Sequence, residues 1–212
     1  MSTTETILLE KNAFFKAGGP AKIIINKGYA CVMGFEKEAP VEIIVPAERT
    51  VIIRGVSDKV EIKSITSSTN SFSKIVSSEE QVILDKWFKT ATLLAEDKLD
   101  SIIVLGETDS GKSTFLSLLA NTILQFKKEN PLVFDTDIGQ SEIAYPTTLG
   151  SGIVGKDDSY QYVMSTSNHK LTYIGHVTPQ PVVEKYLARL ALLEKLWRSE
   201  KKGPLLINTD GW

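Results

Sequence analysis

Four residues in the middle of the chain have the types and the spacing that bind a polyphosphate. Gly106, Gly111, Lys112 and Ser113 satisfy the pattern G-x-x-x-x-G-K-[ST]. In this pattern the glycines let main-chain N–H groups turn inward around an anion. The lysine neutralises phosphate oxygens, and the hydroxyl ligates Mg²⁺. We therefore predict a phosphate-binding P-loop with these nucleotide-binding residues: Gly106, Glu107, Thr108, Asp109, Ser110, Gly111, Lys112, Ser113 and Thr114.

The elements around this loop have the order that such a loop requires. The apolar run at 101–105 predicts a strand buried on both faces, and residues 114–126 read as a helix. A second strand is expected at 131–135 and a further one at 204–208. Strands that alternate with helices indicate an α/β fold with a P-loop kinase-type parallel sheet flanked by helices. A glycine-rich turn with a surface lysine is the alternative, and it does not need this strand–loop–helix context.

A long amphipathic helix is predicted after the loop region, beginning at Pro181 and ending before Gly203. Leucines recur along it at helical spacing, and we expect that stripe to face the core: Leu187, Leu190, Leu193 and Leu196. On the other side of the helix, Lys185 and Arg189 are four residues apart and share a face. A solvated surface is the simpler interpretation of this basic pair, and contact with a nucleic-acid backbone is the alternative.

Two carboxylates follow the second predicted strand. Asp135 and Asp137 are alternate residues in FDTDIGQ, so both can project from the strand end toward one crevice. Carboxylates there can hold Mg²⁺ or accept a proton from an attacking hydroxyl. Two solvated turn residues are the alternative interpretation. Beside a P-loop the catalytic interpretation is favoured, and which aspartate is the base stays open.

The first third of the chain has a different character. Short apolar or alternating runs recur through residues 1–66, separated by turn-forming residues, which predicts a small β-sandwich or barrel. We expect this domain to cover residues 1–70, a serine-rich linker to cover 71–78, and the P-loop domain to cover 79–212.

Composition limits the remaining function classes. The net charge is −2, so any nucleic-acid binding must depend on a local patch. The single cysteine, Cys31, excludes an internal disulfide and reads as a small buried apolar residue. No apolar run approaches the ~20 residues that cross a membrane. We expect an intracellular protein without a membrane partner, cytoplasmic in a prokaryote and nuclear in a eukaryote.

Four motifs in one order, TDSGKSTF, DTDIGQSE, GHVTPQ and NTDGW, resemble those of the polynucleotide 5′-hydroxyl kinase family of RNA processing. The resemblance implies transfer of the ATP γ-phosphate to the 5′-hydroxyl of RNA, with DNA as an open alternative. It implies ATP and Mg²⁺ as cofactors, and Lys112, Asp135 and Asp137 as catalytic residues. Ser113, Asp135 and Asp137 would hold the metal. The substrate-binding residues that it implies are Gln140, Thr178, Pro179, Thr209 and Trp212.

The chain also departs from this family. Glu107 stands where the family commonly has proline. The family continues past its T-x-G-W element into a basic lid with paired arginines, so we expect residues 79–212 to be a P-loop domain truncated on its C-terminal side. An ATP-binding scaffold subunit of an RNA-processing complex, catalytically silent and bound to protein partners, is therefore the alternative function. A switch-type GTPase is disfavoured because the chain has no N-K-x-D motif.

Overall fold

The structure is a computed structural model, and the chain divides into two compact units, Met1–Ala91 and Thr92–Trp212. Each unit is described by itself. The structure describes residues 2–67, 70–141, 143–155, 169–197 and 203–210. Trp212, a predicted substrate-binding residue, lies outside this described part, and so do residues 198–202 at the end of the predicted long helix.

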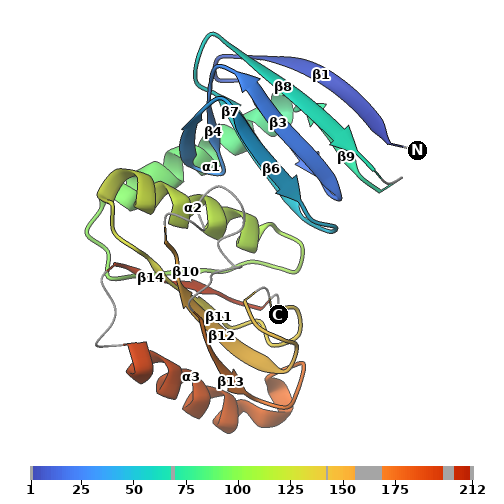
Figure 1. The fold of residues 1–212 in the computed structure, drawn as a ribbon. Helices are drawn as coiled ribbons and strands as arrows, with labels where there is room; N and C mark the ends of the chain where they lie inside the picture. Colours follow the sequence, from blue (N-terminus) through green and yellow to red (C-terminus); the bar gives the residue numbers. More distant parts are fainter. Residues whose placement is uncertain (1, 68–69, 142, 156–168, 198–202, 211–212) are drawn as a thin grey trace. The chain divides into compact units, whose positions relative to one another are not determined.

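The first unit is built from two antiparallel sheets (Figure 1). One sheet has the strand order β1-β8-β3-β6 and the other β5-β4-β7-β2-β9. This arrangement confirms the predicted all-β N-terminal part. The strands are β1 Thr3–Glu10, β2 Phe14–Gly18, β3 Ala21–Lys27, β4 Tyr29–Val32, β5 Phe35–Glu38, β6 Val41–Val45, β7 Thr50–Gly55, β8 Lys59–Thr66 and β9 Phe72–Ile75.

Alternating apolar residues explain the strands of this unit. In β3, Ile23 and Ile25 are fully buried, and in β8 Val60 and Ile62 are fully buried, while the residues between them are more exposed. One face of each strand therefore packs inside the unit. Strand β9 lies within the segment 71–78 that we expected to be a linker. It pairs with β2 through its main chain although its side chains are mostly exposed, so composition alone did not indicate it.

Helix α1, Ser78–Glu96, follows β9. Ser77 caps its N-terminus, because the Glu80 N–H donates to Ser77 Oγ at 3.3 Å. Farther along the helix, Phe88 is buried and its ring centre lies 5.1 Å from that of Phe14. Burial of these aromatic rings ties the first half of α1 to the β unit.

The second unit contains a five-stranded sheet of order β10-β14-β11-β12-β13. Strands β10 (Ser101–Val104), β14 (Leu205–Asn208) and β11 (Leu132–Asp135) are parallel, as predicted. Strands β12 (Thr148–Ile153) and β13 (His169–Tyr173) are antiparallel, so the sheet is mixed and not purely parallel. The described residues between β11 and β12 form no crossover helix, and a short return reverses the strand direction.

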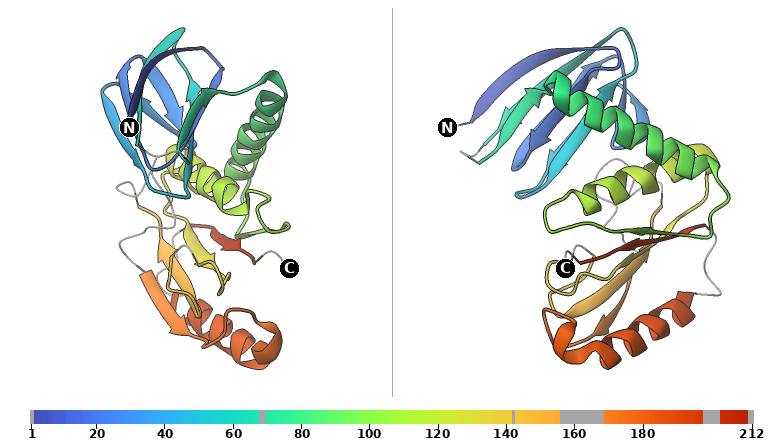
Figure 2. Two further views of the ribbon diagram at one scale, coloured as in Figure 1. Left: turned by 90° about the vertical axis from the view of Figure 1, so that its right-hand side faces the viewer. Right: turned by 180° about the vertical axis from the view of Figure 1, so that it is seen from behind.

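Two helices lie on opposite faces of this sheet, as the ribbon views show (Figures 1 and 2). They are α2, Lys112–Lys127, and α3, Val183–Trp197, which a short 3₁₀ helix at Gln180–Val182 precedes. Helix α2 follows β10 directly after the predicted P-loop. The predicted P-loop kinase-type α/β fold is therefore confirmed, with the antiparallel strands as its correction.

One expectation about burial in this unit was wrong, and another was confirmed only in part. Strand β10 is the outer strand of the sheet and is not buried on both faces; Ile103 is 58% exposed. In α3 the predicted core stripe is confirmed at Leu193, which is fully buried, and at Leu190, which packs against the core, whereas Leu187 and Leu196 are exposed. The buried side of α3 also carries Trp197, whose indole N–H donates to Ser151 Oγ at 2.7 Å. An aromatic residue thus takes the core position that the leucine pattern assigned to Leu196.

In the described part of the chain no helix is long and apolar enough to cross a membrane. Cys31 in β4 is buried, as expected, and burial raises the pKa of its thiol to about 12. The thiolate is the reactive species, so the thiol should be inert in the folded protein.

We predict that Cys31 reacts with an aromatic disulfide reagent at pH 8 on the order of a thousandfold more slowly in the native protein than after denaturation, because its pKa lies near 12 and not near 9. The absorbance of the released thiolate measures the rate. An equal rate in both states would contradict the burial of Cys31 in β4.

Candidate nucleotide-binding site

The predicted P-loop connects β10 to α2 and has the strained main chain that tight phosphate loops require. Gly111 precedes the helix with a φ of 88°, a conformation that favours glycine. A Cβ atom at Gly106 would lie 2.6 Å from Ser110 Oγ, so a larger residue there would require the Ser110 side chain to move. No side chain caps α2. Its first amides therefore have no acceptor within the helix, which leaves donors and the positive end of the helix for an anion.

Lys112 closes this loop from within. Its ammonium Nζ donates to the Glu107 carbonyl at 2.8 Å, across the loop. The Ser110 N–H donates to the same carbonyl at 3.3 Å. The ammonium is thereby held at the loop, while the Glu107 side chain is exposed.

Asp135 ends β11 and is fully buried. Its Oδ2 accepts hydrogen bonds from Ser141 Oγ at 2.8 Å and from the Ile143 N–H at 3.3 Å. Its Oδ1 accepts from the Asp137 N–H at 3.3 Å and from the Asn208 amide at 3.1 Å. Both oxygens of this carboxylate are therefore engaged by protein donors, which is how a buried charge is stabilised.

Asp137 has a different environment. It is half-buried, and its Oδ1 accepts from the Gly139 N–H at 3.0 Å and the Gln140 N–H at 2.8 Å. Its Oδ2 accepts no hydrogen bond from any described residue. One oxygen thus fixes the turn after β11, and the other is available to a ligand.

A residue that the sequence did not single out connects the two motifs. Asn208, at the end of β14, is 2% exposed. Its Nδ2 donates to Ser113 Oγ at 3.3 Å and to Asp135 Oδ1 at 3.1 Å. The P-loop serine and the strand-end aspartate therefore lie in one hydrogen-bonded cluster, as we expected of the two motifs. Its sequence signals were its place at the end of a predicted strand and its position as the first residue of the NTDGW motif, and neither pointed to a link between the two halves of the site.

A hydrogen bond from α3 also fixes the main chain between Asp135 and Asp137. The Tyr186 hydroxyl of α3 donates to the Thr136 carbonyl at 3.0 Å. Burial raises the pKa of this phenol, and the carboxylates of Asp210, Asp137 and Asp135 raise it further. The hydroxyl therefore keeps its proton and remains a donor at neutral pH.

The remaining predicted substrate residues lie in the loops around the strand ends, and their exposure differs. Gln140 and Thr178 are exposed, whereas Pro179 is buried. The Thr209 hydroxyl donates to the Val104 carbonyl at 2.8 Å, so this side chain secures the end of β10. Val177 lies against the aspartate turn, because a Cβ atom at Gly139 would lie 2.8 Å from the Val177 carbonyl oxygen.

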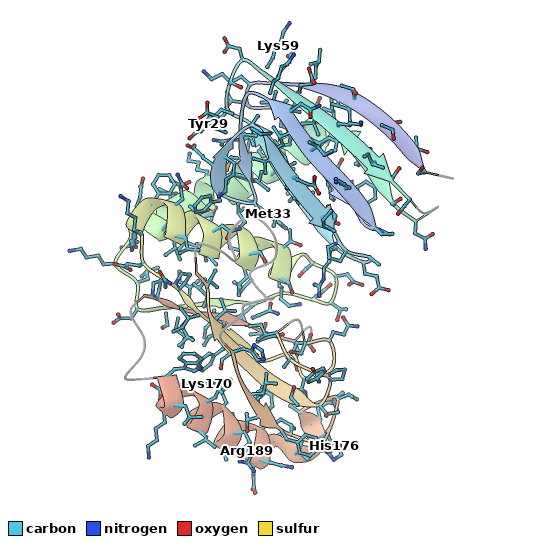
Figure 3. The ribbon with its side chains drawn as sticks, viewed as in Figure 1. Tyr29, Met33, Lys59, Lys170, His176 and Arg189 are labelled. Atoms are coloured by element: carbon cyan, nitrogen blue, oxygen red, sulfur yellow. The ribbon has the colours of Figure 1, made fainter. Side chains whose placement is uncertain are left out.

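Lys185 and Arg189 on α3 have different environments and do not form one basic surface. Lys185 donates to the Ile174 carbonyl at 2.7 Å, which anchors the helix to the end of β13. Arg189 is exposed and lies on the side of α3 turned away from the sheet (Figure 3). His176 is exposed in the turn that follows β13 (Figure 3).

The donor set fits a hard divalent cation such as Mg²⁺. The Ser113 hydroxyl and the Asp135 carboxylate belong to one hydrogen-bonded cluster, to which Asp137 is joined through its main-chain N–H. Hydroxyl and carboxylate oxygens are the ligands that Mg²⁺ prefers. The Asn208 Oδ1 is a further oxygen there, buried and without a partner among the described residues. The described part of the chain has no group of three His, Cys, Asp or Glu side chains that could hold a metal alone. Phosphate oxygens and water would therefore complete the coordination.

The two aspartates should contribute unequally to the stability of the fold. We predict that Asp135→Leu lowers the free energy of unfolding by about 3 kcal/mol, because four donors lose their acceptor, and that Asp137→Leu lowers it by about 1 kcal/mol. Urea unfolding of the nucleotide-free protein, followed by the fluorescence of the buried Trp197, measures both. A larger loss at Asp137 would contradict the hydrogen bonds described for Asp135.

Comparison with known proteins identifies a family whose model covers the P-loop and the aspartate turn. The family model of the mRNA cleavage and polyadenylation factor CLP1 P-loop matches residues 106–212, which is half of the chain. Among curated proteins, a CLP1 homolog of Anopheles gambiae is 30% identical over 118 residues, which cover 52% of this chain and 28% of that protein. The polyribonucleotide 5′-hydroxyl-kinase Clp1 of Xenopus laevis is 29% identical over 118 residues, covering 52% of this chain and 27% of that protein.

Solved structures agree on the fold. A wild-type Clp1p–Pcf11p complex superposes with a TM-score of 0.70 at 14% identity, covering 98% of this chain and 54% of the other. A second structure of the Pcf11p–Clp1p interface, described with the basis for ATP loss in a point mutant, gives a TM-score of 0.71 at 11% identity, with 99% and 55% covered. The chain thus spans about half the length of these structures and matches less than a third of the curated relatives. With its P-loop, aspartate turn and sheet in this arrangement, the chain belongs to the CLP1 P-loop family.

Proposed function

We propose that this chain carries the nucleotide site of a polynucleotide 5′-hydroxyl kinase, which transfers the γ-phosphate of ATP to the 5′-hydroxyl of RNA. The observation that carries the proposal is the hydrogen-bonded link from Ser113 through Asn208 to Asp135, which joins the P-loop to the aspartate turn. The name of the Xenopus relative, a polyribonucleotide 5′-hydroxyl-kinase, supports RNA as the acceptor. We infer a nuclear location in a eukaryote, as for other factors of messenger RNA processing.

The proposed chemistry needs positioning and charge neutralisation more than covalent help. The amides at the start of α2 and the Lys112 ammonium bind the phosphates, and the ammonium exchanges the Glu107 carbonyl for a phosphate oxygen. The Ser113 hydroxyl, and the Asp135 carboxylate through water, would hold Mg²⁺, and the metal would supply positive charge that neutralises the phosphates. Asp135 holds Ser141 and Asn208 in place through hydrogen bonds, since its oxygens already accept from these protein donors.

The transfer step can be assigned to named atoms. The oxygen of the 5′-hydroxyl forms a bond to the γ-phosphorus, while the bond from that phosphorus to the β–γ bridging oxygen breaks and ADP leaves. The hydroxyl proton goes to Asp137 Oδ2, which has no hydrogen bond from any described residue. This assignment separates the two aspartates, with Asp137 as the base and Asp135 as its support.

A non-enzymatic scaffold is the second candidate function. It is favoured by the two solved neighbours, both described as assemblies of Clp1p with Pcf11p, one of them with the structural basis for ATP loss in a point mutant. In that function bound ATP would stabilise a conformation that a protein partner recognises, without turnover.

Label transfer distinguishes the two functions. We predict that the protein moves label from γ-³²P ATP to a 5′-hydroxyl oligoribonucleotide, and that Lys112→Ala lowers the rate at least about a hundredfold by removing a charge from the developing transition state. Lys98→Ala, which removes an exposed lysine elsewhere in the same unit, should keep the rate of the wild type. A 5′-phosphorylated oligonucleotide is the blank, and a DNA oligonucleotide tests acceptor choice. ATP binding without transfer would overturn the kinase in favour of the scaffold.

The base assignment has its own test. We predict that Asp137→Asn lowers kcat by roughly a hundredfold or more but changes the ATP dissociation constant by less than about threefold, because the amide oxygen can still accept from Gly139 and Gln140. Single-turnover kinetics and equilibrium titration with a fluorescent ATP analogue separate the two quantities. A kcat within a few-fold of the wild type would exclude Asp137 as the base.

A further inference from the structure

Asn208 occupies the central position of the three parallel strands. It lies in register with Val104 of β10 on one side and with Asp135 of β11 on the other. Val104 is two residues before the P-loop, and Asp135 begins the aspartate turn. In-register residues of parallel strands point to the same face of a sheet. Asn208 is therefore the residue of β14 that stands directly between the two halves of the site.

The main chain of Asn208 is held firmly in this position. Its carbonyl accepts from the Thr136 N–H at 3.0 Å and from the Thr136 hydroxyl at 2.7 Å. The next residue, Thr209, donates to the Val104 carbonyl at 2.8 Å. Strand β14 thus joins the ends of both neighbouring strands, and the Asn208 side chain starts from a fixed point.

The side chain makes two bonds with one amide nitrogen. Nδ2 carries two hydrogens, and one is directed to Ser113 Oγ while the other is directed to Asp135 Oδ1. Because an ionised carboxylate can only accept, the group beside Asp135 must be the nitrogen of the amide. By donating to Ser113, the amide fills one acceptor position of the hydroxyl and leaves the other for a cation.

The amide oxygen of Asn208 has a different environment from the amide nitrogen. Asn208 Oδ1 is buried and receives no hydrogen bond from the described residues, although a buried polar oxygen without a partner costs about 1–3 kcal/mol. An oxygen acceptor left open in a cluster of Mg²⁺-type ligands suits a water molecule that accompanies the cation.

We propose that Asn208 is a positioning residue that sets the spacing between the Ser113 hydroxyl and the Asp135 carboxylate, and so couples Mg²⁺ to triphosphate binding. This inference depends on the nucleotide-binding half of the proposed function and not on phosphoryl transfer. Asn208 touches neither the γ-phosphate nor the 5′-hydroxyl in this proposal; it acts through Ser113 and Asp135.

Asparagine fits position 208 better than leucine, aspartate or serine. A leucine would give no donor to either partner. An aspartate would put two carboxylates about 3 Å apart, and such a pair shares a proton because both cannot ionise at that distance. A serine side chain has a single donor hydrogen, so it cannot donate to both partners.

The test uses Asn208→Asp and measures ATP affinity by titration, with and without Mg²⁺, at pH 6 and pH 8. We expect the gain in affinity that Mg²⁺ gives the wild type to shrink at least tenfold in the variant at pH 8. At pH 6 part of the gain should return, because a shared proton restores a hydrogen bond between residue 208 and Asp135. A merely structural defect would not respond to pH in this way.

Thermal unfolding provides a readout that does not involve ligand. In the folded variant the pKa of the carboxyl pair is raised, so the folded state binds a proton that the unfolded state has lost. Its stability relative to the wild type should therefore fall as the pH rises from 5 to 8. Asn121→Asp is the matched control, since Asn121 is fully buried in α2 and lies outside the site. The Asn121→Asp variant should have a lower melting temperature but the same increase in ATP affinity on addition of Mg²⁺ as the wild type.

Three results would overturn the inference. The first two concern Asn208→Asp: an unchanged Mg²⁺-dependent gain in ATP affinity, or a loss of that gain that is equal at pH 6 and pH 8. The third is a wild-type protein that binds no triphosphate. If Asn208→Asp does not fold, Asn208→Ser replaces it, with the same loss of gain expected at both pH values. Loss of the Mg²⁺ gain in a protein that transfers no phosphate would support Asn208 as the positioning residue and reject the kinase.

Discussion

The place of β14 between β10 and β11 determines where every polar group of the site lies. Because the three strands are parallel and in register, their carboxyl ends present the P-loop, Asn208 and Asp135 in one row. The main-chain bonds of Asn208 and the Thr209 hydroxyl secure both neighbours at this edge. Without that strand, the loop and the aspartate turn would be separate features of the chain.

The two aspartates illustrate how similar residues acquire different tasks from their surroundings. Asp135 is buried under four protein donors, whereas Asp137 uses one oxygen for its own turn and keeps the other open. Burial suits the first carboxylate to a supporting role, and partial exposure suits the second to the role of base that we propose for it. Tyr186 fixes the carbonyl that separates them, so the distinction is preserved by a contact from α3.

Much of this arrangement could be predicted from the sequence because the relevant signals are local. The P-loop, the helix after it and the strand ending at Asp135 follow from short patterns of glycine, hydroxyl and apolar residues. Asn208 could not be found in this way, because its importance depends on strand order, which no local pattern contains. The antiparallel direction of β12 and β13 was not predicted for the same reason. Trp197 is buried at the end of α3 where the leucine spacing placed Leu196 in the core, because that spacing considers leucines alone.

The bond from Lys112 to the Glu107 carbonyl bears on the tolerance of the loop to sequence change. The acceptor is a main-chain atom, which glutamate and proline share, and the acidic side chain is exposed. Position 107 can therefore vary in charge while the lysine keeps the same resting contact. An acidic group at the rim of the loop would instead act at longer range, on how readily an anion approaches, and salt would screen that influence.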